Sequence, residues 1–277
     1  MRLLLTTLAL CLLPVTPMAS EPVKAIQTAI DGEHRSAENR ARDKFRHPLE
    51  TLEFFGLRPD MTVVEMWPGS GWYTQILAPV VAAEGHLYTA QYSANPRAGY
   101  QRRYYGAFLT MLGSNPDVYR DVTVTTFYPP YQLEIAPRGS ADMVLTFRNL
   151  HNWIGDQRKD GVSAALAFRA MYDALKPGGI LGITDHRWPE DQSDADPFNT
   201  GYMKASEAIA LAEAAGFKLV ARSEVNANPR DTHDYEKGVW TLPPSLALGE
   251  TDREKYLAIG ESDRFTLKFV KPDGATP

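Results

Sequence analysis

Two short polar stretches of the sequence hold the side chains best suited to chemistry. FRNLHNW and TDHRW together contain Arg148, Asn149, His151, Asn152, Trp153, Asp185, His186 and Arg187. Each stretch follows an apolar run typical of a β-strand, and the carboxyl ends of parallel strands form the ligand crevice of an open α/β sheet. His151 or His186 is therefore a candidate general base near neutral pH, with Asp185 orienting an imidazole or binding a cationic substrate. The alternative is that these residues cap the following helices and pair with one another at the surface.

A third stretch, VVEMWPGSGW, has the pattern of a strand followed by a nucleotide-binding turn. Gly69 and Gly71 allow the backbone to turn tightly and approach a ligand, while the start of the next helix presents free N–H groups. Pro68 removes one of these donors. Trp67 stands where the first glycine of such a turn is usual, and it either closes the pocket or forms an aromatic wall for a flat ring.

The elements that must position these residues alternate between strand and helix patterns. Seven strands are expected, in MTVVEM, GHLYTAQYS, DVTVTTFYPP, ADMVLTFRNLHNW, KPGGILGITDHRW, the end of ASEAIALAEAAGFKLVARSEV, and RFTLKFVKP. Helical patterns include WYTQILAPVVAA and VSAALAFRAMYDAL. This order predicts an α/β fold with a doubly wound, seven-stranded, mostly parallel sheet, similar to the Rossmann arrangement.

Two segments lie outside this plan. Residues 21–56 are expected to form an N-terminal helical extension in front of an α/β domain at 57–277. Residues 225–262 form a long insertion between the last two strands, where connections of ~4–6 residues are usual. Apolar residues such as Trp240 favour an ordered cover over the carboxyl edge of the sheet, and a purely structural wrap is the alternative.

The first twenty residues, MRLLLTTLALCLLPVTPMAS, predict a signal peptide at 1–20 that is cleaved after Ser20. Its apolar run is shorter than the ~20 residues of a membrane-spanning helix. The protein is therefore expected to be exported, periplasmic or secreted, without a stable membrane anchor. The only cysteine, Cys11, leaves with the signal, which excludes a disulfide or a thiolate metal site from the mature protein. A net charge of −5 without a Lys/Arg run argues against a nucleic-acid partner and favours a small molecule.

The sequence resembles class I S-adenosylmethionine-dependent methyltransferases, and more closely a family of exported bacterial proteins described as predicted methyltransferases, with the motif E-x-W-P-G-x-G-W-Y. The broad resemblance covers residues 57–224 and the last strand. The closer one extends to HRSAENRARDKFRHPLETLEFFG, FRNLHNW, GVWTLPP and YLAIGESDR. It implies S-adenosylmethionine as cofactor, surrounded by Glu65, Trp67, Gly69, Gly71, Gln91 and Asn149. We expect catalysis from His151, Asp185 and His186, and substrate contacts from Arg148, Trp153, Arg187 and Trp240.

Gln91 is the main departure from the methyltransferase pattern, which usually places a carboxylate there to bind the ribose hydroxyls. A neutral amide cannot form those charge-assisted bonds, so the sequence predicts a low affinity for S-adenosylmethionine. An exported ligand-binding or accessory protein on a methyltransferase fold therefore remains an alternative. A metal-assisted enzyme is a third, using His34, Asp43 and His47 with the strand-end histidines. Because no spacing resembles H-E-x-x-H, no metal site is predicted.

Overall fold

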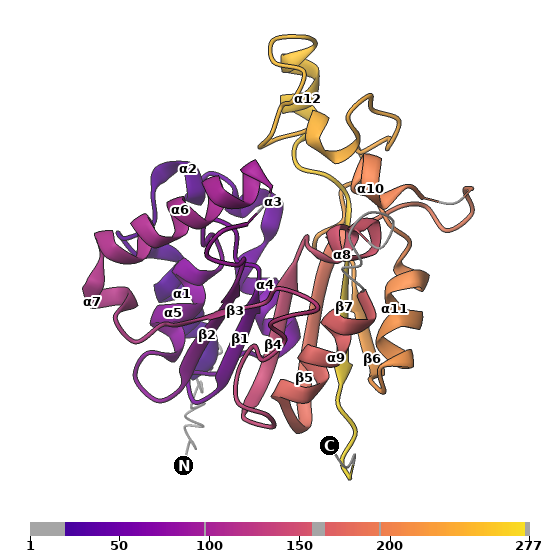
Figure 1. Ribbon diagram of the computed structural model, residues 1–277. Helices are drawn as coiled ribbons and strands as arrows, with labels where there is room; N and C mark the ends of the chain where they lie inside the picture. The colour runs from indigo at the N-terminus through magenta and orange to yellow at the C-terminus, as the bar shows by residue number, and fades with distance from the viewer. Residues whose placement is uncertain (1–19, 97, 157–163, 194, 275–277) are drawn as a thin grey trace, which may run out of the picture.

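The centre of the molecule is a seven-stranded sheet (Figure 1). The computed structural model describes residues 20–96, 98–156, 164–193 and 195–274, so the expected signal peptide lies outside the described residues except for Ser20. The strands are β1 (Thr62–Met66), β2 (His86–Gln91), β3 (Thr123–Thr126), β4 (Ala141–Phe147), β5 (Leu175–His186), β6 (Lys218–Ser223) and β7 (Arg264–Val270). Their order is β3-β2-β1-β4-β5-β7-β6, and only β7 runs antiparallel to its neighbours. The doubly wound, mostly parallel sheet is thus confirmed.

The chain changes its direction of travel across the sheet between β1 and β4. Strands β1, β2 and β3 are added one after another toward one edge of the sheet. The next strand, β4, then pairs with the other side of β1. At such a switch point the connections after the two neighbouring strands leave toward opposite faces, so a crevice opens at the strand ends. Here the crevice lies beyond Met66 and Phe147, the last residues of β1 and β4.

Helices cover both faces of the sheet. One face carries α1 (Glu21–Asp31), α4 (Pro48–Phe55) and α5 (Thr74–Val81). The other carries α9 (Ala164–Ala174) and α11 (Ala205–Ala214). The inward stripes of α9 and α11 are rich in alanine, which lets these two helices lie close to the strands and to each other. Two apolar cores result, one on each side of the sheet.

The other helices that the structure describes are mostly short, and most of them lie around the carboxyl end of the parallel strands. They are α2 (Ala37–Arg40), α3 (Asp43–Arg46), α6 (Gly99–Ser114), α7 (Pro116–Tyr119), α8 (Leu150–Asp156), α10 (Pro197–Thr200), the 3₁₀ helix η1 (Gly238–Thr241) and α12 (Arg253–Ile259). Figure 1 shows α2, α3 and α6 above one half of the sheet and α10 and α12 above the other. Within the described ranges, no helix combines the length and the apolar character that crossing a membrane requires.

The structure divides one stretch that the sequence pattern treats as a single strand. In ADMVLTFRNLHNW, β4 ends at Phe147, and α8 begins at Leu150. Between them Arg148 adopts a left-handed backbone conformation with φ of 62°. Trp153 consequently lies on a helix and not on a strand. The sequence pattern also gives no position for α6, because only Phe108 is buried along its sixteen residues and no apolar stripe marks it.

The extension and the insertion meet at the antiparallel strand β7. The amide of Asn226, in the insertion, donates to Thr51 on α4 at 3.0 Å and to Thr266 on β7 at 2.9 Å. Arg46 on α3 pairs with Glu261, which lies just before β7, at 3.0 Å. These buried polar contacts fix two segments that are distant in sequence over the same end of the sheet.

Candidate active site

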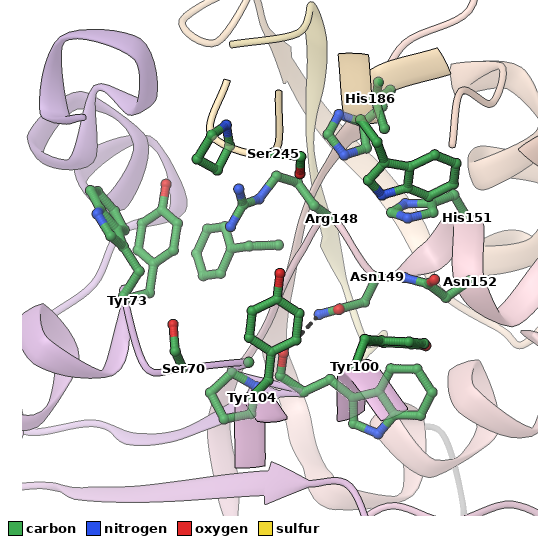
Figure 2. Close-up of a pocket in the computed structure, with 18 of the residues that line it drawn as sticks. Ser70, Tyr73, Tyr100, Tyr104, Arg148, Asn149, His151, Asn152, His186 and Ser245 are labelled. Carbon is green, nitrogen blue, oxygen red and sulfur yellow. Dashed lines mark hydrogen bonds between the residues drawn. The ribbon is translucent and has the colours of Figure 1, made fainter. Parts of the chain in front are cut away.

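A cavity of about 520 Å³ opens at the switch point between β1 and β4. Its walls come from the extension, the turn after β1, α6, the ends of β4 and β5, and the insertion. Eight residues expected at the site line it: Glu65, Trp67, Gly69, Arg148, Asn149, His151, His186 and Trp240. Figure 2 shows Arg148 reaching toward Tyr73 on one side, while His151 and His186 lie together on the other. The structure therefore gathers residues from four separate stretches of sequence around one space.

The turn after β1 keeps a glycine-like backbone although its first position is tryptophan. Trp67 has φ of 43°, in the left-handed region, followed by φ of 62° at Gly69 and 90° at Gly71. The Trp67 indole donates to the carbonyl of Phe127 at 3.1 Å and packs edge-on against Trp153, with 5.4 Å between ring centroids. Only 6% of Trp67 is exposed. Its ring is thus mainly part of the core, and its remaining edge forms an aromatic wall.

Glu65 is a buried carboxyl group at the end of β1. It is 2% exposed and accepts a hydrogen bond from the Thr74 hydroxyl at 2.6 Å. Burial raises the pKa of Glu65 to about 8, against the opposing effects of the Thr74 bond and the charge of Arg148. The group is therefore largely protonated at neutral pH, and it contributes little negative charge to the cavity.

The side chains of Gln91 and Asn149 hold the turn after β1 through hydrogen bonds to its main chain. Both ends of the buried Gln91 amide are bonded to main chain, since its nitrogen donates to the Gly69 carbonyl at 3.0 Å and its oxygen accepts from the Tyr92 N–H at 2.9 Å. The Asn149 amide donates to the carbonyls of Met66 and Trp67 at 2.9 and 3.2 Å, one of which is dashed in Figure 2. Gln91 does not line the cavity, whereas Asn149 does.

Asp185, near the end of β5, and His151, at the start of α8 after β4, form a buried pair. The Nδ1 atom of His151 lies 2.8 Å from a carboxylate oxygen of Asp185. The carboxylate also accepts from the main-chain N–H groups of Leu150, at 2.7 Å, and His186, at 2.8 Å. Because an ionised carboxylate can only accept, the proton is assigned to Nδ1, and in the tautomer that this selects Nε2 bears the lone pair. This is the arrangement of an oriented general base.

His186 stands beside that pair but has different chemistry. Its ring centroid is 5.1 Å from that of His151, and its Nδ1 lies 2.5 Å from the Ser262 hydroxyl. Burial, aided by the neighbouring His151 and Arg264, lowers the pKa of His186 well below its usual value. It is therefore a neutral polar group at physiological pH.

Besides Gln91, four expected site residues do not line the cavity. Gly71 lies behind the turn, where an added Cβ would come within 2.3 Å of Met111. Trp153 is completely buried against Trp67 and Phe127. Arg187 binds Asp263 at 2.9 Å and Glu224 at 2.6 Å. Asp185, the fourth, acts on the cavity only through the histidine that it holds.

Two residues of the metal alternative, His34 and Asp43, are engaged elsewhere. His34 Nε2 contacts the carbonyl of Gln75 at 2.7 Å, and Asp43 pairs with Arg35 at 2.7 Å. Ligand atoms of His151, Asp185 and His186 do lie within 4.8 Å of one another. These three residues are already hydrogen-bonded: Asp185 to His151 and to the main-chain N–H of His186, and the His186 ring to Ser262. Hydrogen bonding alone therefore accounts for their close approach.

Sequence reasoning missed a group of charged and aromatic residues at the cavity. Tyr73 from the turn, Tyr100 and Tyr104 from α6, and Arg264 at the start of β7 line it, and Glu261 pairs with Arg264. The sequence offered two hints of these residues, the helical spacings R-x-x-x-R at 42–46 and E-x-x-R at 261–264. Neither spacing predicts that the two pairs meet, because they belong to opposite ends of the chain.

A second cavity of about 380 Å³ adjoins the first. The two share Trp67, Tyr92, Tyr100, His151, Asn152 and Trp240. Its other walls include Phe127, Tyr128 and Tyr131, after β3. The flat aromatic surfaces suit a planar ring.

Solved structures with a similar fold are methyltransferases and a related enzyme. A SAM-dependent methyltransferase from Aquifex aeolicus superposes with a TM-score of 0.53 at 16% identity, over 91% of this chain and all of that one. The [4+2]-cyclase SpnF gives 0.55 at 17% identity, over 91% and 93%. Phosphoethanolamine N-methyltransferase 2 from Haemonchus contortus, solved with S-adenosyl-L-methionine, gives 0.52 at 17% identity, over 91% and 57%. No family model and no curated protein matches the sequence.

The fold is therefore the Rossmann-like fold of class I S-adenosylmethionine-dependent methyltransferases. A cyclase on the same fold shows that this architecture does not determine one reaction. The chemistry of this chain has to be argued from its own cavity.

Proposed function

We propose that the protein transfers a methyl group from S-adenosylmethionine to a small molecule, with His151 as the general base. The observation that carries the proposal is the buried Asp185–His151 pair at the cavity, which leaves the imidazole lone pair on Nε2. In this fold the cavity lies at the switch point, where ligands of open α/β sheets bind. A base at this position suits a substrate whose nucleophilic atom carries a proton.

The residues after β1 fit the cofactor that the fold implies. An added Cβ on Gly69 would meet no atom within 4 Å, so the backbone there is open to a ligand. Gly69 and the edge of Trp67 would hold the cofactor, with the aromatic second cavity beside Trp67 receiving its flat ring. Gln91 keeps the turn in place through its bond to the Gly69 carbonyl. When bound, the cofactor supplies an electrophilic methyl group on a sulfonium.

The protein's own groups would align the substrate and accept its proton. His151 takes the proton at Nε2, and the Asp185 carboxylate stabilises the imidazolium that results. Neutral His186, beside it, adds a polar contact without repelling that charge. Trp240, whose ring centroid is 6.3 Å from that of His151, covers this part of the cavity and limits the access of water.

Binding of S-adenosylhomocysteine tests the proposal, and two glycines make a matched pair of variants. Gly69 and Gly139 have φ of 62° and 63°, and an added Cβ has free space at both, but only Gly69 lines the cavity.

In calorimetry with residues 21–277, wild type should bind S-adenosylhomocysteine saturably. Ligand at 100 times its dissociation constant should add ~2.7 kcal/mol to stability. Gly69→Asn should weaken binding about tenfold or more, and Gly139→Asn should leave it unchanged. Absence of saturable binding in wild type would favour the ligand-binding alternative.

We also propose that the protein acts outside the cytoplasm, in the periplasm or after secretion. The apolar run at 3–15 and the small residues before Glu21 support cleavage after Ser20. The first helix, α1, begins at Glu21, so cleavage there would leave the described fold complete. N-terminal sequencing of the protein from a periplasmic extract should begin at Glu21. Leu8→Arg should retain the full-length chain in the cytoplasm, and equal export of both forms would contradict the proposal.

A further inference from the structure

Four arginines converge on one buried glutamate at the extension side of the cavity. Glu261 is 2% exposed and binds Arg42 at 2.7 Å and Arg46 at 3.0 Å. It also binds Arg264, and Arg148 lies 3.9 Å away. All four arginines line the cavity. Arg42 and Arg46 come from the extension, Arg148 follows β4, and Arg264 begins β7.

The charges in this cluster do not balance. Four guanidinium groups surround one carboxylate, which leaves three positive charges. Glu65, an acidic residue that lines the cavity, does not compensate, because burial raises its pKa to about 8. Arg103 adds a further positive group at the cavity wall. Within the described part of the chain, the cavity wall is therefore strongly cationic.

Several donors of the cluster also lack hydrogen bonds. Nη2 of Arg42, Nη1 of Arg46 and Nε of Arg264 are buried without a partner in the described structure. Arg46 and Arg264 are each 2% exposed. The Arg148 side chain is about a quarter exposed, and Figure 2 shows it pointing into the cavity. Buried charged donors are costly unless they are paired, so this arrangement is expected to be completed by an acceptor.

Burial lowers the pKa of two arginines in the cluster. Burial, together with the nearby charge of Arg264, lowers the pKa of Arg148 to about 10. Burial and repulsion from Arg148 lower the pKa of Arg46 well below its usual value, although Glu261 acts in the opposite direction. An additional anion would relieve this repulsion. Forked guanidinium groups bind carboxylate and phosphate oxygens in pairs, which gives both strength and orientation.

We propose that the substrate carries a carboxylate or phosphate group that binds between Arg148 and the buried arginines around Glu261. The assignment to the substrate rests on the proposed methyl transfer. Arg148 and His151 both line the cavity and lie three residues apart, on either side of the start of α8. An anionic group bound to Arg148 on one side of the cavity would leave the rest of a small molecule to extend across it toward His151. Methylation would occur at a nucleophilic atom remote from the anion.

Phenyl phosphate is a suitable probe, because it joins a phosphate to a ring that the aromatic walls can contact. Phenol is the matched neutral control. Calorimetry with residues 21–277 in a low-salt buffer should show saturable binding of phenyl phosphate and none of phenol. Arg148→Gln should weaken binding about tenfold or more, because a charge-assisted pair is lost. Arg40→Gln changes an exposed arginine outside the cavity and should have no effect.

Each variant is first checked for its fold by circular dichroism and thermal unfolding. Should Arg148→Gln fail to fold, Arg42→Gln takes its place, since that side chain is also about a quarter exposed. Absence of saturable binding by wild type, or equal affinity in the folded cavity variant, would overturn the anion site.

A competition experiment separates the substrate from the cofactor as the source of the anion. S-adenosylhomocysteine also carries a carboxylate. If the arginines serve the substrate, saturating S-adenosylhomocysteine should leave phenyl phosphate binding within about twofold of its original affinity. One-for-one displacement would overturn the assignment to the substrate. If S-adenosylhomocysteine does not bind while phenyl phosphate does, methyl transfer is rejected and the anion site stands.

Discussion

The Glu65 carboxyl group is buried, so its negative charge is costly in the folded state. Its titration should therefore change the free energy of unfolding with pH. Its folded-state pKa, about 8, is above the unfolded value of 4.5 because of burial. The folded state therefore binds the proton more tightly. The stability that Glu65 contributes is fully present below pH 4.5 and is lost as the pH rises toward 8.

Glu65→Gln should remove this dependence, since glutamine keeps the shape and can still accept from Thr74. Relative to wild type, the variant should gain stability between pH 5 and pH 8, by about 4 kcal/mol at most. Urea unfolding of both proteins at the two pH values measures the change. Glu84→Gln, at an exposed position, is the control. Parallel stability curves for wild type and Glu65→Gln would show that the carboxyl group is ionised in the folded state at neutral pH.

At the scale of elements, the strands could be predicted well and the helices between them less well. Each strand is a short run of β-branched and apolar residues, bounded by turn residues, and buried strands give this signal clearly. Helix α6 does not, because Phe108 is its only fully buried residue and it presents mostly polar and aromatic residues. The start of α8 was also missed, since only the left-handed Arg148 marks the end of β4. Backbone conformation at a single residue is poorly encoded in periodicity.

The same limit applies to the site. Topology alone brings His151 and Asp185 together, because Asp185 lies near the end of β5 and His151 follows the neighbouring parallel strand β4. Sequence reasoning could anticipate that meeting. It could not tell which way a side chain turns, and the side chain of Gln91, the last residue of β2, donates to the Gly69 carbonyl. It also could not join Arg42 to Glu261, which lie 219 residues apart. Such contacts depend on how the extension and the insertion dock, and neither has a periodic pattern that fixes its partner.

At the scale of the whole molecule, Glu261 connects the extension to the sheet. It binds Arg42 and Arg46 from the extension and Arg264 from β7. Burial alone would raise the pKa of Glu261, but the surrounding arginines outweigh burial and hold it well below its usual value. The carboxylate is thus charged at neutral pH, and it is the counter-ion that allows both segments to bring arginines into one buried place.

Glu261→Gln should therefore destabilise the protein by about 3–5 kcal/mol, because it leaves a buried cluster of arginines without a counter-ion. Glu224→Gln is the matched control. It removes a carboxylate that pairs with Arg187 but is 71% exposed, so its cost should stay below about 1 kcal/mol. Urea unfolding gives both values.

Inorganic phosphate should then raise the melting temperature of Glu261→Gln more than that of wild type, since an anion between the arginines replaces part of the lost charge. Potassium chloride at equal ionic strength controls for screening. Equal stability of the two glutamine variants would mean that the arginines do not need Glu261. A phosphate effect no larger than that of chloride would mean that the space between them does not hold an anion, and the extension would then be joined to the sheet by its apolar contacts and by Asn226.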